Sequence, residues 1–91
     1  MADDTFRGMD VAAARKAANE MLTDAAQIGS LIRMVDGTVA ELPWEGPDAI
    51  AFREQWRGRF RTELTQTVDN LVRQGGDLEA RAARQEQASR H

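Results

Sequence analysis

The stretch LPWEGPDA, residues 42–49, stands at the middle of the chain between two long apolar repeats. Pro43 stops the preceding repeat from continuing as a helix, because the residue before a proline is pushed out of the helical region. Gly46 has no Cβ and so suits a sharp reversal, and Pro47 suits the first position of a helix, where its missing N–H costs nothing. These residues predict a tight turn over 43–47 between two helices.

The segment before the turn is predicted to be one helix over about 10–42. Asp10 can cap its N-terminus, because its side chain can accept a hydrogen bond from an orphan backbone N–H. Two apolar series with seven-residue spacing run through the segment without a charged residue: Val11, Ala18, Ala25, Ile32 and Val39, and Ala14, Met21, Ile28, Val35 and Leu42. A repeat of this kind is typical of helices that pack along each other at shallow angles.

The segment after the turn is predicted to be a second helix over about 48–86. Asp48 places negative charge at the positive end of the helix dipole. The apolar series reads Ala49, Phe52, Trp56, Phe60, Leu64, Val68, Leu71, Gly75, Leu78 and Ala82. Its spacing is four from Phe52 to Val68 and then alternates three and four, which resembles a local stutter that changes the supercoil without ending the helix.

Gly75 and Gly76 leave two interpretations of the second helix, because each glycine costs roughly 1 kcal/mol relative to alanine inside a helix. In one, the helix ends there and Asp77 caps a short third helix. In the other, which we favour, a continuous or slightly bent helix passes through and Gly75 lets the two helices approach closely.

The fold class expected for the single domain 1–91 is all-α, because no alternating apolar–polar run predicts a strand. Two rods of roughly 50 and 60 Å would form an antiparallel helical hairpin. Its seam, within the hairpin or a dimer, is predicted to hold Ile32, Val35, Val39, Phe60, Leu64, Val68 and Leu71. Flanking residues stay exposed in a lone hairpin: Leu31, Met34, Ile50 and Val72. A second hairpin that completes a four-helix bundle is therefore expected.

Composition excludes several classes of function. The net charge is −3 and there is no cysteine, so neither disulfides nor thiolate metal sites can form. The chain is not basic enough to favour nucleic acid, and the cluster Arg53, Arg57, Arg59 and Arg61 is expected to be a solvated face or a set of intersubunit ion pairs. No stretch approaches the ~20 apolar residues of a membrane span, and the helices carry too little basic charge for a membrane-surface role.

Chemistry-bearing residues do not gather into a catalytic pattern. We find no nucleophile–base pair, no phosphate-binding loop and no Glu-x-x-His motif, so we expect no enzyme activity, metal or cofactor. His91 is the sole histidine and the final residue, where fixed geometry is not expected. The N-terminal stretch MADDTFRG is acidic and lacks an apolar core, so it is not expected to be a cleavable signal peptide.

Trp44 beside the turn has two interpretations. A tight connection cannot bury a large indole within itself, so Trp44 either lies against the helix ends as an apolar plug or projects toward a partner as a recognition tip. The Trp44-x-Gly46 triplet between two long helices resembles the WXG family, the Esx-like substrates of type VII secretion. Phe52-x-x-x-Trp56 is similar to the aromatic pair that often follows the turn in that family.

The resemblance implies a hairpin that pairs with itself or with a sister WXG protein. It implies a small secreted effector or companion protein, exported by a non-classical route through the type VII secretion ATPase as a further partner. It also implies that Trp44 and Gly46 contribute half of a composite recognition surface, with Phe52 and Trp56 packed by the turn. From the residues alone we favour a homodimer over a heterodimer.

One departure from the family pattern concerns the export signal Tyr-x-x-x-Asp/Glu, which usually follows the second helix. The chain contains no tyrosine, and the corresponding segment, residues 77–87, reads DLEARAARQEQ. Either a partner subunit supplies the signal, or the tyrosine position has diverged, or the protein is not itself exported. The last case defines the alternative function, an intracellular helical adaptor or toxin-associated module.

Overall fold

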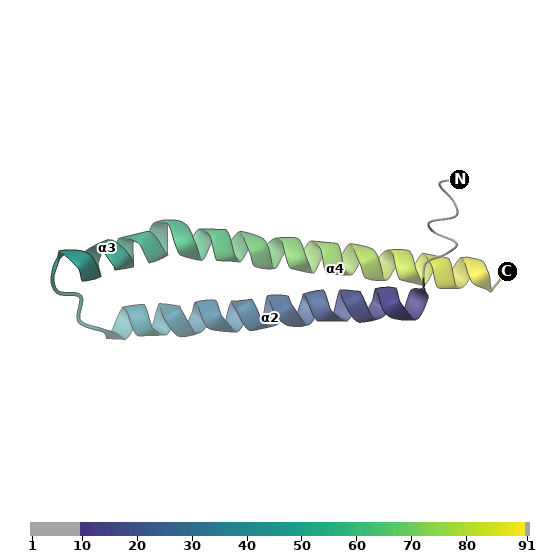
Figure 1. Cartoon of the computed structure of the whole chain (residues 1–91), viewed down its shortest axis with the longest axis horizontal. Helices are drawn as coiled ribbons and strands as arrows, with labels where there is room; N and C mark the ends of the chain where they lie inside the picture. Colours follow the sequence, from purple (N-terminus) through teal and green to yellow (C-terminus); the bar gives the residue numbers. More distant parts are fainter. Residues whose placement is uncertain (1–9, 91) are drawn as a thin grey trace.

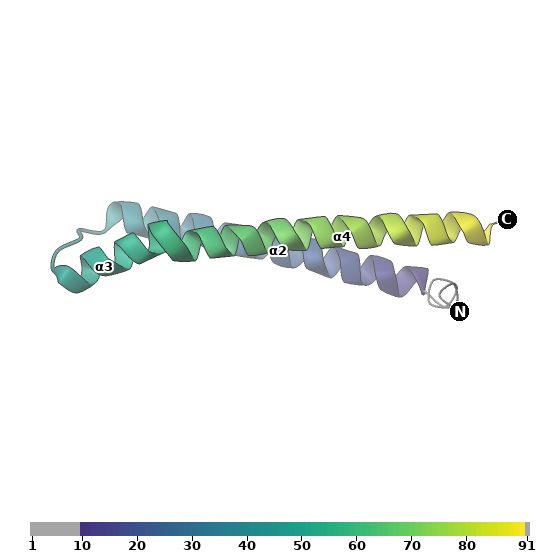
Figure 2. The same ribbon diagram turned by 90° about the horizontal axis from the view of Figure 1, so that it is seen from above.

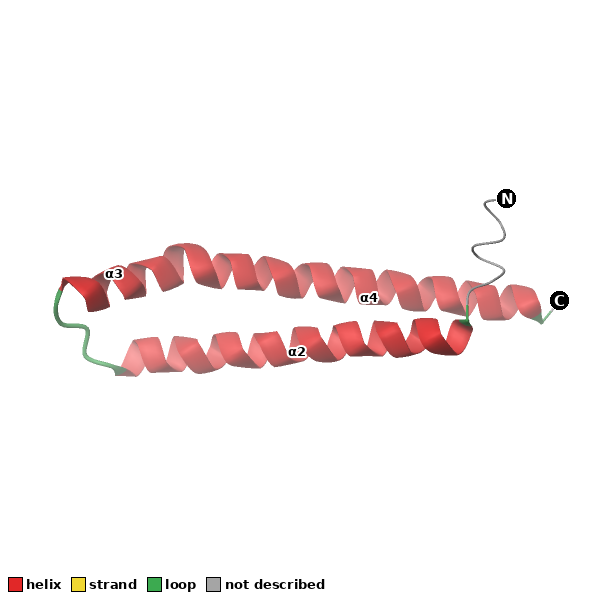
Figure 3. Ribbon diagram, in the orientation of Figure 1, coloured by secondary structure: helices red, strands yellow, loops and turns green. Residues whose placement is uncertain are grey.

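The computed structural model describes residues 10–90, which form two antiparallel helical rods joined at one end by a turn (Figure 1). Helix α2 comprises Val11–Glu41. The second rod is α3, Pro47–Gln55, followed without a break by a π-turn, Trp56–Phe60, and by α4, Arg61–Ser89. These residues contain no strand (Figure 3), and the chain measures 66 × 22 × 13 Å along its principal axes. The all-α prediction is confirmed, whereas the four-helix bundle stays a prediction.

The predicted helix ends agree closely with those observed. Asp10 caps α2, because its Oδ1 accepts a hydrogen bond of 3.1 Å from the backbone N–H of Ala13. At the other end Leu42 is extended, as expected for a residue before proline. The second rod begins at Pro47 and ends at Ser89, three residues beyond the predicted Glu86. The expectations for residues 1–9 and His91 lie outside the described residues.

Gly46 sets the direction in which the second rod departs from the turn. Its φ is +86°, a left-handed conformation that a side chain with a Cβ rarely adopts. It precedes Pro47, the first residue of α3, whose fixed φ suits a helix start. The role predicted for Gly46 in the reversal is therefore confirmed, and the residue itself is exposed at the tip.

The irregular spacing after the turn is accommodated by the π-turn. The N–H of Arg61 donates to the carbonyl oxygen of Trp56, five residues back. In a regular α-helix, Phe52 and Leu64 would point about 120° apart, because each residue advances about 100° around the axis. The wider turn absorbs the excess, so both residues keep facing α2. The spacing of four predicts a departure from regular helix geometry in this part of the rod. The structure accommodates it in one π-turn rather than by a change in supercoiling.

The seam between the rods changes in composition along its length. Away from the turn it consists of small buried residues: Ala14, Ala18, Ala25, Gly75 and Ala82. Near the turn, Ile32, Val39 and Trp56 form a buried cluster. At the small-residue end the rods approach closely, because a methyl group on Gly75 would lie 3.2 Å from the backbone oxygen of Ala18. The continuous helix that we favour through Gly75-Gly76 is confirmed.

A lone hairpin leaves much apolar surface uncovered. The two rods lie along each other and cross at a shallow angle (Figure 2). Each rod therefore has one side against the other rod and leaves its remaining sides uncovered. The exposed large apolar residues are Leu31, Met34, Leu42, Ile50, Phe52, Leu64 and Val72. They include all four residues predicted to be exposed. The spacing places Leu42 in an apolar series of the first helix, but α2 ends before it and its side chain is exposed.

Candidate partner-binding site

Trp44 closes the turn end of the hairpin. Its side chain is half-buried and packs against the cluster of Ile32, Val39 and Trp56. The indole Nε1–H donates a hydrogen bond to the carbonyl oxygen of Val39, one of the last carbonyls of α2. The ring also stacks on Phe52, with centroids 5.9 Å apart and planes 17° from parallel. This geometry matches the plug interpretation, and a role in recognition would have to use the exposed part of the ring.

Replacing Trp44 by alanine is therefore expected to lower stability. A fully buried tryptophan costs about 3–5 kcal/mol when truncated, and the half-buried Trp44 should cost roughly 1–2 kcal/mol. Urea unfolding followed by circular dichroism measures the loss. An unchanged unfolding midpoint, together with weakened binding to a partner, would identify Trp44 as a recognition tip instead.

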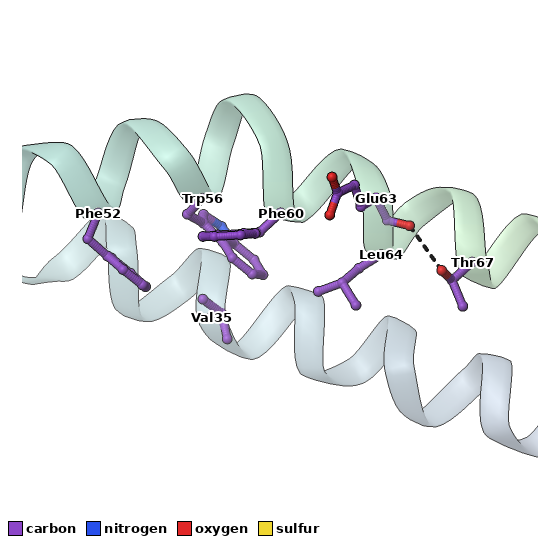
Figure 4. A pocket seen from close by; sticks show the side chains of 7 residues that line it. All are labelled: Val35, Phe52, Trp56, Phe60, Glu63, Leu64 and Thr67. Carbon is purple, nitrogen blue, oxygen red and sulfur yellow. Dashed lines mark hydrogen bonds between the residues drawn. The ribbon is translucent and has the colours of Figure 1, made fainter.

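An apolar groove lies next to this plug. We call it the aromatic groove; it is lined by Val35 from α2 and by Phe52, Trp56, Phe60, Glu63, Leu64 and Thr67 from the second rod (Figure 4). Its volume is about 510 Å³. Phe52 is 46% exposed and Leu64 36%, whereas Trp56 at the floor is only 5% exposed. The groove thus has a fixed floor and accessible walls.

The chemistry of the groove is that of apolar contact. The Thr67 hydroxyl donates to the backbone oxygen of Glu63 at 3.1 Å, so this donor is already engaged within the helix. The remaining polar side chain of the lining is Glu63, whose carboxylate pairs with Arg59 at 3.2 Å. The groove can receive apolar side chains of a partner, with one acidic residue at its rim.

A polar cluster holds the rods together near the same level. The Asp36 carboxylate of α2 accepts a hydrogen bond from Trp56 Nε1 at 2.9 Å. It also accepts from Arg61 Nε at 3.1 Å on Oδ1 and 3.0 Å on Oδ2. We call these three residues the Asp36 cluster. Its contacts bridge the two rods and satisfy the polar atom of the buried indole.

The Asp36 cluster corrects one sequence-based interpretation. Arg61 is expected in a solvated or intersubunit set with Arg53, Arg57 and Arg59, but it pairs within the chain. Arg59 pairs with Glu63 along its own helix. The sequence holds a signal for the cluster, since Asp36 lies four residues after Ile32 and three before Val39, both predicted at the seam. A carboxylate in that register faces the opposite rod.

Because of the Asp36 cluster, we expect the folded protein to lose stability in acid. The hydrogen bond from Trp56, followed by that from Arg61, holds the pKa of Asp36 below its ordinary value of 3.8, with a smaller contribution from the Arg57 charge. Because the native carboxyl binds a proton less readily than the unfolded one, its stabilisation is present above the unfolded pKa and is lost as pH falls through the lower native pKa.

Thermal unfolding between neutral pH and pH about 3 measures this dependence. We expect the melting temperature of Asp36→Asn to fall less than that of the wild type below pH 3.8, the ordinary pKa of an aspartate. Parallel curves for the two proteins would contradict a native pKa lowered by these contacts.

The other residues predicted at the site lie partly in the buried seam and partly in the aromatic groove. Ile32 and Val39 are buried as core residues. Val35, Phe60, Val68 and Leu71 are half-buried. Val35, Phe60 and Leu64 line the groove together with the predicted aromatic pair Phe52 and Trp56. Leu64, predicted at the seam, lies at its edge. The structure separates the aromatic pair, with Trp56 in the core and Phe52 on the surface.

No group of three His, Asp or Glu side chains that could hold a metal ion occurs in the part of the chain that the structure describes. None of the helices formed by residues 11–89 is long and apolar enough to cross a membrane. Comparison of the chain with protein-family models, curated proteins and solved structures found no match.

Proposed function

We propose that this chain is a protein-binding helical hairpin of the WXG kind that acts as a dimer in type VII secretion. The observation that carries the proposal is the aromatic groove, an open apolar surface on a hairpin whose rods cover only one side of each other. Large exposed apolar patches on soluble proteins mark interaction sites. The function is accordingly one of binding.

We commit to a second copy of the chain as the partner of the groove. Exposed apolar residues also lie outside the groove, among them Leu31 and Met34 on α2 and Val72 on α4. A second hairpin of the same length can cover such surface along the rods, and a two-fold axis lets each copy cover the exposed apolar surface of the other. Two hairpins then form a four-helix bundle. A sister WXG protein would present the same kind of surface, and it is the competing partner.

Sedimentation analysis of the purified protein tests the dimer. We expect Leu64→Glu to weaken self-association by at least about tenfold, because a charge would be buried in the interface, and tenfold corresponds to about 1.4 kcal/mol. Thr62→Glu is the matched control, because residue 62 is exposed in the same helix outside the groove. A wild-type protein that stays monomeric at high concentration would require a different partner.

Secretion is proposed from the resemblance of Trp44-x-Gly46 and the following aromatic pair to the WXG pattern. In this proposal the protein leaves the cell through the secretion ATPase, as an effector or as a companion of a larger cargo. Recovery of the protein from culture medium, in strains with and without the ATPase, is the direct test. Equal retention inside both strains would count against export.

The alternative function, an intracellular helical adaptor or toxin-associated module, is favoured by the missing tyrosine. The pair Ala80→Tyr and Arg84→Glu would install Tyr-x-x-x-Glu at two exposed positions of α4. If this variant alone is secreted, the natural chain lacks its own signal and the adaptor is supported. If secretion instead depends on a co-expressed partner in both forms, the chain is a companion that its partner carries out.

A further inference from the structure

The Asp36 cluster and the π-turn involve the same two residues. Trp56 and Arg61 are joined by the backbone hydrogen bond that defines the π-turn, from the Arg61 N–H to the Trp56 carbonyl oxygen. Their side chains both donate to Asp36, through Nε1 and Nε respectively. The Asp36 carboxylate on α2 thus accepts hydrogen bonds from Trp56, the first residue of the π-turn, and from Arg61, the first residue after it.

This convergence depends on the π-turn. In an α-helix, residues five apart are separated by about 140° around the axis, because each advances about 100°. Side chains so placed leave the helix in widely different directions, which disfavours hydrogen bonds from both of them to one short carboxylate side chain. A π-turn closes its hydrogen bond between residues five apart and brings them to nearly the same side. The contacts to Asp36 therefore favour the π-turn over a regular helix.

We propose that Asp36 is a positioning residue that holds Trp56–Phe60 in the π-turn and thereby shapes the aromatic groove. The groove needs Phe52, which precedes the π-turn, Trp56, which is its first residue, and Leu64, which follows it, to face α2 together. Without the wider turn, a regular helix would rotate the first two relative to the third by about 100°. The Asp36 carboxylate thus determines the shape of the aromatic groove, although Asp36 does not line it.

The backbone hydrogen bond of Arg61 provides a direct measurement. Scalar coupling across hydrogen bonds, observed by NMR, identifies which carbonyl carbon accepts the Arg61 N–H. In the wild type we expect coupling to Trp56. In Asp36→Ala we expect that coupling to disappear and coupling to Arg57 to replace it, because an α-helix bonds residues four apart. The Trp56 indole N–H resonance should shift as it loses its acceptor.

The matched control is Asp77→Ala. It also removes an aspartate that pairs with one arginine, Arg81, at 3.1 Å, but that pair lies within α4 and spans no π-turn. We expect the Arg61–Trp56 coupling to be unchanged in this variant. Retention of the wild-type coupling in Asp36→Ala would overturn the proposal.

If Asp36→Ala does not fold, Asp36→Asn decides the question. Asparagine keeps an oxygen that can accept from the Trp56 indole, but it removes the charge that attracts Arg61. We expect the Arg61–Trp56 coupling to weaken in this variant and an Arg61–Arg57 coupling to become detectable. Full wild-type coupling in a folded Asp36→Asn protein would also overturn the proposal.

The effect on partner binding rests on the proposed function and is measured separately. Sedimentation of the same variants reports self-association, while the coupling reports the π-turn. A variant that loses the π-turn and still dimerises as the wild type does would leave Asp36 as the positioning residue and would count against the groove as the partner site. The two ideas can therefore fail independently.

Discussion

Replacing Trp56 by alanine is expected to lower the free energy of unfolding by roughly 3–5 kcal/mol, the range measured for buried aromatic residues. The indole is 5% exposed and forms, with Ile32 and Val39, the buried cluster near the turn. The substitution would leave a cavity and would remove the hydrogen bond to Asp36. Native domains have a total stability of about 5–15 kcal/mol, so the variant should be close to unfolding.

Phe52→Ala is the control for this prediction. Phe52 lies one helical turn earlier in the same rod, but its side chain is 46% exposed. We expect its truncation to cost less than half as much as that of Trp56, when both are measured by urea unfolding of dilute protein. Equal losses for the two variants would contradict the assignment of Trp56 to the core and Phe52 to the surface.

The backbone of this hairpin could be predicted because its signals are local. Pro43 and Pro47 bracket the turn, Asp10 caps the first helix, and the seven-residue spacing identifies the side of each helix that faces the other. Each of these effects depends on a few neighbouring residues. The turn, the helix boundaries and the burial of Ile32 and Val39 therefore follow from the sequence.

The site could be predicted less completely because its geometry depends on pairing across the rods. The spacing of four from Phe52 to Val68 identifies an irregularity, but a sequence does not say whether supercoiling or a single π-turn absorbs it. The choice is made by the contacts of Trp56 and Arg61 with Asp36, twenty and twenty-five residues away. The orientation of Phe52 and Trp56 relative to Leu64 follows from that choice.

The paired variants Gly75→Ala and Gly76→Ala are expected to change stability in opposite directions. A methyl group on Gly76 would meet no neighbouring atom within 4 Å, and this replacement should stabilise the helix by about 0.5–1 kcal/mol. A methyl group on Gly75 would lie 3.2 Å from the backbone oxygen of Ala18 and 3.2 Å from Cγ of Leu22. Both glycines lie in the interior of α4, so they share the same gain in helix propensity.

Whether Gly75→Ala stabilises or destabilises the protein depends on which of the neighbouring atoms can move. The Leu22 side chain is half-buried and can shift, but the Ala18 oxygen belongs to the backbone of α2 and can retreat only if the rods separate. Overpacking of this kind costs about 1–3 kcal/mol, which exceeds the propensity gain of roughly 1 kcal/mol. Thermal unfolding of the two variants should therefore give a lower melting temperature for Gly75→Ala and a higher one for Gly76→Ala. Stabilisation by both would mean that the rods are not held in close contact at this point.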